Sequence, residues 1–200
     1  MPSPAALAYN IAAKKARILR ETATDTRLRP ISHSQTQVYY HSALATLVAA
    51  WEAYIEELVR NFFDVTANPL DPKFDAVHSI ARNAAMESIK RFNTPNFDNT
   101  RNLLVQYTGY DPIGDWIWSV RSMNAVATRQ MLNEILQVRH SFAHGFPIPP
   151  YSWTQTATGK VRLTAKAIKD IEAFFRYLVY VTDRGMKQHI QTSYSIVVLW

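Results

Sequence analysis

The chain has 200 residues, 48% of them hydrophobic and 12% aromatic, which is enough apolar material for one domain with its own core. It contains no Cys, which excludes disulfides, thiolate metal sites and Cys nucleophiles, and favours a reducing compartment such as the cytoplasm. The formal net charge of +6 favours polyanionic partners. Because the 22 Lys and Arg residues are spread along the chain, a generally basic surface explains the charge equally well.

No sequence feature supports a membrane protein or a protein that depends on a cofactor or a metal. The basic residues Lys14, Lys15 and Arg17 interrupt the N-terminal region, so we expect no signal peptide, and no apolar run of about 18 residues predicts a membrane span. Phosphate-binding and dinucleotide-binding glycine motifs are absent, and the His residues are scattered without a His-Glu-x-x-His pair. We therefore expect no cofactor and no metal.

Apolar residues recur at helical spacing through most of the chain, so we expect an all-α fold. The first helix is expected over residues 4–27 and is ended by Arg29-Pro30. One side carries Leu7, Ile11, Ile18 and Leu19, and the other carries Lys14, Lys15, Arg17 and Arg20. The basic side could contact RNA or a membrane, and the plainer alternative is a solvated face on a helix packed against the domain.

The clearest helix is expected over residues 34–67 and should be the main core helix. Its apolar stripe consists of Leu44, Leu47, Val48, Trp51, Tyr54, Ile55, Leu58, Val59 and Phe62. The glutamates at positions 52, 56 and 57 lie beside this stripe. We prefer surface pairing of Glu56 with Arg60, a contribution of about 0.2–0.5 kcal/mol, over a catalytic role for these carboxylates.

Prolines at 69, 72 and 95 delimit a middle region with two inserted helices. Residues 74–92 have helical spacing through Phe74, Val77, Ile80, Ala84 and Ile89. Asn96 is a plausible cap for a short helix over residues 97–107 that carries Leu103 and Leu104. Both helices are expected to lie across the bundle rather than to form a separate domain.

A further helix is expected over residues 116–144, because Gly145 and the prolines after it stop the pattern and leave His144 at the helix end. A small hairpin is expected between Tyr151 and Leu163. Thr164 should cap a last helix that ends near Gln191, with Ile168, Ile171, Phe175, Leu178 and Met186 inward. The hydrophobic tail 196–200 should pack on its own bundle or on a second subunit. The expected architecture is one antiparallel helical bundle spanning residues 1–200.

The segment Val138–Gly145 is chemically unusual for a buried helix. On an ideal helix, the apolar residues from Met131 to Phe142 cover an arc of roughly 160°, and Arg139 falls inside it. A buried guanidinium is too costly to leave unpaired, so Arg139 should reach a carboxylate, a phosphate or a wet interface.

The positions of His140 and His144 add a geometric constraint. These two residues share a helix face, whereas Arg139 and His144 lie roughly 140° apart. Convergence of Arg139 and His144 would need a frayed helix end, a long side chain that reaches round, or a second copy of the helix across a twofold axis.

An Arg with one or two His residues and no metal is sufficient for RNA cleavage. Imidazole can take a proton from a 2′-hydroxyl or give one to the leaving oxygen, and guanidinium can stabilise the charged phosphorus centre. The direction of proton transfer at His144 stays open, because helix C-terminal carbonyls also favour a protonated His. The alternatives are a non-catalytic module in which Arg139, His140 and His144 bind RNA or a nucleotide or hold a dimer, and a purely structural buried Arg.

The Arg139, His140 and His144 pattern, followed by Gly145, resembles the motif of the HEPN superfamily: an Arg, four to six residues and then a His, with a polar residue directly after the Arg. The segment Leu47–Leu58 is similar to the first core helix of the RiboL-PSP-HEPN-type subgroup. The resemblance implies a helical bundle, a homodimer that brings two motifs together, and metal-independent endoribonuclease activity that leaves a 2′,3′-cyclic phosphate. Arg139 and His144 then correspond to the catalytic pair, with His140 as an auxiliary group where Asn is commoner.

Proteins of this kind are typically prokaryotic toxins or anti-phage effectors that a partner such as an antitoxin restrains. Another subgroup carries, two residues after the motif His, a Tyr that a partner enzyme modifies with AMP. Phe146 occupies that position here and has no hydroxyl, so silencing by that route is not expected.

Overall fold

The computed structural model describes residues 1–28, 32–68 and 70–200; the predicted helix breaks at Arg29-Pro30 and Pro69 lie outside this part. Within it the chain forms six α-helices, short 3₁₀ turns and no strands, which confirms the all-α prediction. The helices are α1 (Pro4–Thr22), α2 (His33–Thr66), α3 (Pro72–Ile89), α4 (Phe97–Thr108), α5 (Ala125–Ala143) and α6 (Ala165–Tyr194).

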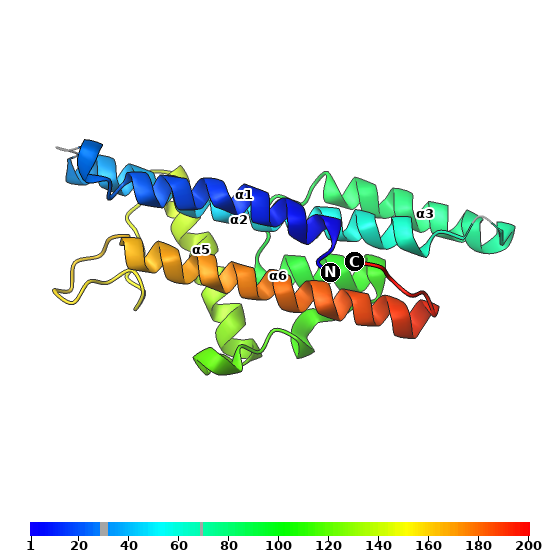
Figure 1. Cartoon of the computed structure of the whole chain (residues 1–200). Coiled ribbons are helices and arrows are strands. Elements are labelled where there is room, and N and C mark those ends of the chain that lie inside the picture. Colours follow the sequence, from blue (N-terminus) through cyan, green and yellow to red (C-terminus); the bar gives the residue numbers. More distant parts are fainter. Residues whose placement is uncertain (29–31, 69) are drawn as a thin grey trace.

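The long helices α1, α2 and α6 lie side by side along the long axis of the molecule, and α1 runs antiparallel to both α2 and α6 (Figure 1). Helix α5 crosses this direction steeply, and its C-terminal end reaches the layer formed by α1 and α2 (Figure 1). The two ends of the chain lie close together near the middle of the bundle. The candidate motif is thus carried on a helix that crosses the main bundle rather than following it.

Helix α2 is the central core element, as its sequence predicts. Ser32 and Gln35 form a reciprocal capping box at its start. Every residue of the predicted apolar stripe is buried, and Trp51 is fully enclosed, with its indole Nε1 donating to the carbonyl of Pro95 at 3.1 Å. This bond fixes the segment before α4 against α2, next to the place where α5 ends.

Helix α1 packs with a different face from the one expected. Leu7, Ile11 and Ile18 are 52–64% exposed, whereas the inward positions are Ala5, Ala6, Tyr9, Ala13 and Ala16. Small alanine side chains let the axes of α1 and α2 approach closely, so the larger apolar residues are left outside. The helix also ends at Thr22, before the predicted residue 27, and a 3₁₀ turn follows at Thr26–Leu28.

Helix α3 also turns a different face inward. Val77 and Ile80 are 68% and 70% exposed, while His78, Ala85 and Ile89 are buried. His78 is accommodated because its Nε2 lies 3.0 Å from the Thr66 hydroxyl. The short helix α4 follows the prediction more closely: Asn96 caps it, and Leu103 and Leu104 are buried.

The prediction that α5 begins near Trp116 is wrong. The helix begins at Ala125, because Asn124 caps it by accepting from the backbone of Ala127 at 2.9 Å. Before it, Ser122 adopts a left-handed φ of 52°, which interrupts helical geometry. Trp116 is nevertheless buried, and its Nε1 donates to the Thr182 hydroxyl at 2.8 Å.

The region after the motif is mostly irregular. The expected hairpin is reduced to one isolated bridge between Gln155 and Val161 in the described chain. Thr164 caps α6 as predicted, and the five residues predicted to point inward from α6 are all buried. In the tail, Val198 is buried and Trp200 packs on the core of the same chain, whereas Leu199 is 81% exposed.

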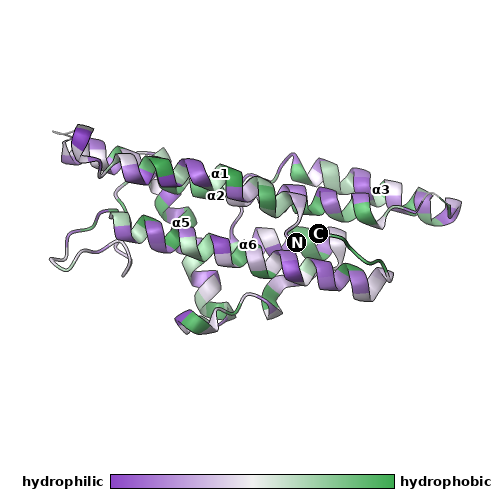
Figure 2. Cartoon of the chain, viewed as in Figure 1, coloured by the Kyte–Doolittle hydropathy of each residue, from purple (hydrophilic) through white to green (hydrophobic). Residues whose placement is uncertain are grey.

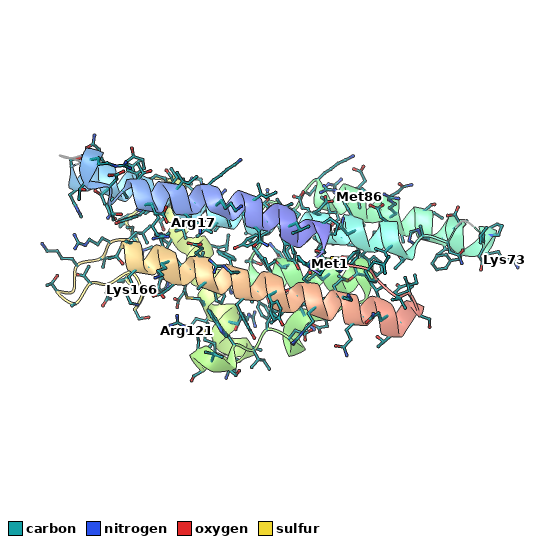
Figure 3. The ribbon with its side chains drawn as sticks, viewed as in Figure 1. Met1, Arg17, Lys73, Met86, Arg121 and Lys166 are labelled. Carbon is teal, nitrogen blue, oxygen red and sulfur yellow. The ribbon has the colours of Figure 1, made fainter. Side chains whose placement is uncertain are left out.

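The surface is polar and its cations are dispersed. Hydrophilic and hydrophobic residues alternate along the visible faces of the helices (Figure 2). The labelled residues Arg17, Lys73, Arg121 and Lys166 lie on separate parts of the molecule (Figure 3), as expected from their spread in the sequence. None of the described helices is long and apolar enough to cross a membrane.

Candidate active site at the end of helix α5

The chain leaves α5 through a well-defined C-terminal turn. The amide of Phe146 donates to the Ser141 carbonyl at 2.8 Å, and the amide of Gly145 donates to the Phe142 carbonyl at 3.2 Å. Gly145 has a φ of 70°, the left-handed conformation that glycine adopts without strain. His144 is the C-cap residue, as the sequence predicts, and its position is fixed by this turn.

Arg139 and His140 line a cleft of about 500 Å³. Its walls come from four places: α5 itself, Val48 of α2, the segment 93–96 before α4, and Pro149 after α5. Arg139 is half-buried, and among the described residues it makes neither a hydrogen bond nor an ion pair. A guanidinium in such a position retains all its donors, and these are directed at whatever enters the cleft.

The acidic group expected near Arg139 is Glu52 of α2. Burial raises the pKa of the Glu52 carboxyl, the nearby Glu56 raises it further, and the positive charge of Arg139 opposes both effects. Glu56 and Glu57 instead bond Arg60 at 3.3 and 3.4 Å, which confirms the predicted surface pairing for Glu56. From the sequence alone, Glu52 could not be distinguished from Glu56 and Glu57. Glu52 follows the cleft residue Val48 by one turn of α2, and only the tertiary structure shows that Val48 lines the cleft.

His140 and His144 are in contact. Their ring centroids are 4.2 Å apart at an interplanar angle of 45°. His144 also lies beside Phe146, with ring centroids 6.0 Å apart at 24°. His144 is exposed and is not part of the cleft wall. His140 thus shares the cleft with Arg139 and contacts His144, whereas His144 does not line the cleft with Arg139.

A second aromatic pair joins the end of α5 to α2. The ring of His41 stacks on Phe142 with centroids 4.2 Å apart and nearly parallel planes. His41 is buried, its Nδ1 has no hydrogen-bond partner among the described residues, and burial lowers its pKa. Phe142 and Phe146 are 41% and 60% exposed, and Val38, one turn before His41, is 53% exposed. The motif therefore lies beside an exposed apolar patch formed by Val38, Phe142 and Phe146.

In residues 1–28, 32–68 and 70–200, no three His, Asp or Glu side chains are arranged to hold a metal ion. The groups in and beside the cleft are instead one guanidinium, two imidazoles and one carboxylate, a set suited to binding an anion and transferring protons.

The fold and this cluster define an all-α protein with an Arg and His site at the end of a core helix. The model of the RiboL-PSP-HEPN family matches residues 14–188, a range that includes α2, the cleft and the motif. The chain belongs to this family, and membership indicates HEPN-type ribonuclease chemistry with RNA as the substrate. Neither the curated proteins nor the solved structures include a significant match to the chain.

Proposed function

We propose that the protein is a metal-independent endoribonuclease that works as a homodimer of one-domain chains. The observation that carries this proposal is the unpaired, half-buried Arg139 in a cleft shared with His140, whose ring contacts His144 at 4.2 Å. An unpaired buried cation is costly, so its retention is best explained by an anion that binds there.

The proposed reaction is transesterification within the RNA. The 2′-oxygen attacks the adjacent phosphorus, the bond from phosphorus to the 5′-oxygen breaks, and the products are a 2′,3′-cyclic phosphate and a free 5′-hydroxyl. One imidazole accepts the proton from the 2′-hydroxyl, and a protonated imidazole donates to the leaving oxygen. Arg139 stabilises the charge on the phosphoryl oxygens, His144 is the main proton-transfer group, and His140 is auxiliary.

Dimerisation is proposed because one copy separates Arg139 from His144. A twofold arrangement of two α5 ends would place the His144 of one chain near the Arg139 of the other. The exposed patch of Val38, Phe142 and Phe146 beside the motif is the kind of surface that a partner copy can cover.

The biological role we propose is that of a prokaryotic toxin or anti-phage effector in the cytoplasm, held inactive by an antitoxin or another regulatory protein. Family membership supports an RNA-directed activity of this kind. Phe146 lacks the hydroxyl that AMP modification would require, so restraint is expected to come from binding rather than from that modification.

The first test is cleavage of RNA in EDTA by the wild-type protein and by Arg139→Ala and His144→Ala. Each substitution should reduce cleavage by about 10²–10⁴-fold, since each removes charge stabilisation or proton transfer. Both variants should fold, because Arg139 has no ion-pair partner to strand and His144 is exposed.

Lys73→Ala and His33→Ala are matched controls, since both residues are exposed and lie on other helices. They should cleave like the wild type. If the motif variants also cleaved like the wild type, the assignment of the site would be wrong. If the protein bound RNA but produced no cyclic-phosphate ends, it would be a non-catalytic binding module.

A further inference from the structure

The cleft extends beyond the motif into a region lined by side-chain amides. Asn133 and Gln137 of α5 and Asn93 and Asn96 of the facing segment all contribute to its wall. Asn133, Gln137 and His140 are spaced by four and three residues, so they share one face of α5. Gln137 lies about 4.5 Å and Asn133 about 10 Å along the helix axis from His140, so the amides extend away from the proposed catalytic groups.

Two of these amides are held in a known orientation. The Oδ1 of Asn133 accepts from the backbone N–H of Phe97 at 3.3 Å, and the Oδ1 of Asn96 accepts from the N–H of Asn99 at 2.8 Å. A backbone N–H can only donate, so the oxygen of each amide must face it. The Nδ2 groups of Asn96 and Asn133 are therefore the free ends, and neither has a partner among the described residues.

Several acceptors that line the cleft already accept a hydrogen bond. The carbonyl of Pro95 accepts from the Trp51 indole at 3.1 Å, and the carbonyl of Thr94 accepts from the Nδ2 of Asn99 at 3.0 Å. The Oε1 of Gln137 accepts from the Tyr151 hydroxyl. The unpaired groups in the cleft thus include the Nδ2 donors of Asn96 and Asn133, to which Arg139 adds its guanidinium.

Apolar groups complete the walls. Val48, Leu136, Pro95 and Pro149 line the same cavity of about 500 Å³. A pocket of this size, with apolar walls and a few fixed hydrogen-bonding groups, is typical of sites for small planar ligands. Next to a phosphate-binding Arg, the planar ligand that fits this chemistry is a nucleobase.

We propose that this cleft holds the base of a nucleotide next to the scissile phosphate and selects keto bases, guanine or uracil, over amino bases, adenine or cytosine. This inference rests on the proposed function. The unpaired Nδ2 donors of Asn96 and Asn133 match the carbonyl oxygen of a keto base. The exocyclic amino group of adenine or cytosine is itself a donor, so it cannot accept a hydrogen bond from these Nδ2 groups. An amino base would leave donors facing donors in a partly buried site.

The experiment is equilibrium binding of the four nucleoside monophosphates to the full chain, as the wild type and as Asn133→Asp. The wild type should bind GMP and UMP at least about 5-fold more tightly than AMP and CMP, respectively. Asn133→Asp keeps an oxygen for the Phe97 amide but replaces the free donor with an acceptor, so this preference should disappear or reverse.

The ratio between keto and amino nucleotides is the deciding quantity. The new carboxylate repels every phosphate equally, so weaker binding of all four nucleotides cancels in the ratio. Asn83→Asp makes the same chemical change on the exposed face of α3 and should leave the ratio as in the wild type. If Asn133→Asp does not fold, Asn96→Asp is the second variant: its carboxylate still accepts from the Asn99 amide, the free donor is lost, and the same loss of preference is expected.

The inference is overturned if the wild type binds the four nucleotides equally, if it binds none of them, or if folded Asn133→Asp retains the wild-type ratio. Binding is measured without turnover, so the two proposals fail separately. If the protein preferred keto nucleotides but did not cleave RNA, the proposed ribonuclease function would be wrong. If it cleaved RNA but showed no base preference, only the proposed base site would be wrong.

Discussion

Arg139 is the residue on which the functional interpretation depends. The sequence predicts it inside the apolar arc of α5, and the structure places it half-buried without an ion pair in the described chain. The expected acid, Glu52, is close enough for its pKa to respond to Arg139, yet it does not bond it. The cleft at Arg139 depends on how α5 crosses α2, and residue spacing along one helix carries no information about that crossing.

The burial of His41 predicts how the stability of the protein depends on pH. In the folded state burial lowers the pKa of His41 below its usual value of 6.5. At pH values between the folded-state pKa and the unfolded-state pKa, the unfolded chain therefore binds more protons than the folded chain. The free energy of unfolding therefore falls as the pH drops below about 6.5. His41→Phe preserves the stacking on Phe142 but removes the titration and the unpaired Nδ1, so the stability difference between about pH 7 and pH 5 should shrink.

Urea unfolding of wild-type protein and His41→Phe at the two pH values measures this difference directly. His33→Phe is the control, since His33 is exposed at the start of the same helix. An unchanged pH dependence in His41→Phe would show that the buried imidazole does not control acid stability.

At the scale of elements, α6 requires a glycine where it passes the segment between α4 and α5. A Cβ at Gly185 would overlap the Tyr110 hydroxyl and the Asp115 carboxylate, which are bonded to each other at 2.7 Å. Gly185→Ala should therefore destabilise the protein by about 1–3 kcal/mol, because the pair must move apart or α6 must shift.

Chemical denaturation of Gly185→Ala beside Gly114→Ala checks this expectation. Gly114 has no atom within 4 Å of an added Cβ, so its variant should stay within about 0.5 kcal/mol of the wild type. Equal stability of the two variants would mean that α6 does not approach Tyr110 as closely as described.

The inward faces of the helices were predicted best where large apolar side chains lie on one face. Helices α2 and α6 have large apolar side chains on one face, and their inward residues were predicted correctly. In α1 the inner face is built from Ala residues and Tyr9, and in α3 from His78, Ala85 and Ile89, so large apolar residues elsewhere on these helices misled the choice of face. The start of α5 was missed because Trp116 is buried by tertiary contacts without being helical.

For the whole molecule, the helical bundle and the family were both accessible from the sequence. The family match over residues 14–188 includes the two segments that carry the resemblance, Leu47–Leu58 and Arg139–Gly145. The amide wall of the cleft was not accessible, because it joins Asn133 of α5 to Asn93 and Asn96 of another segment. Only the tertiary fold brings these residues to one cavity.

The central claim is that two chains share each catalytic site, and it depends on the separation of Arg139 from His144 within one chain. The structure keeps Arg139 in the cleft and His144 outside it, with His140 in contact with His144. If the site is composite, a dimer that combines one Arg139→Ala chain with one His144→Ala chain contains one site with both groups intact.

The most direct measurement is RNA cleavage by this mixed dimer, purified through two different affinity tags, beside the two variant homodimers. We predict that the homodimers are inactive and that the mixed dimer recovers about half of the wild-type rate, since one of its two sites is complete. A mixed dimer as inactive as the homodimers would contradict the shared site.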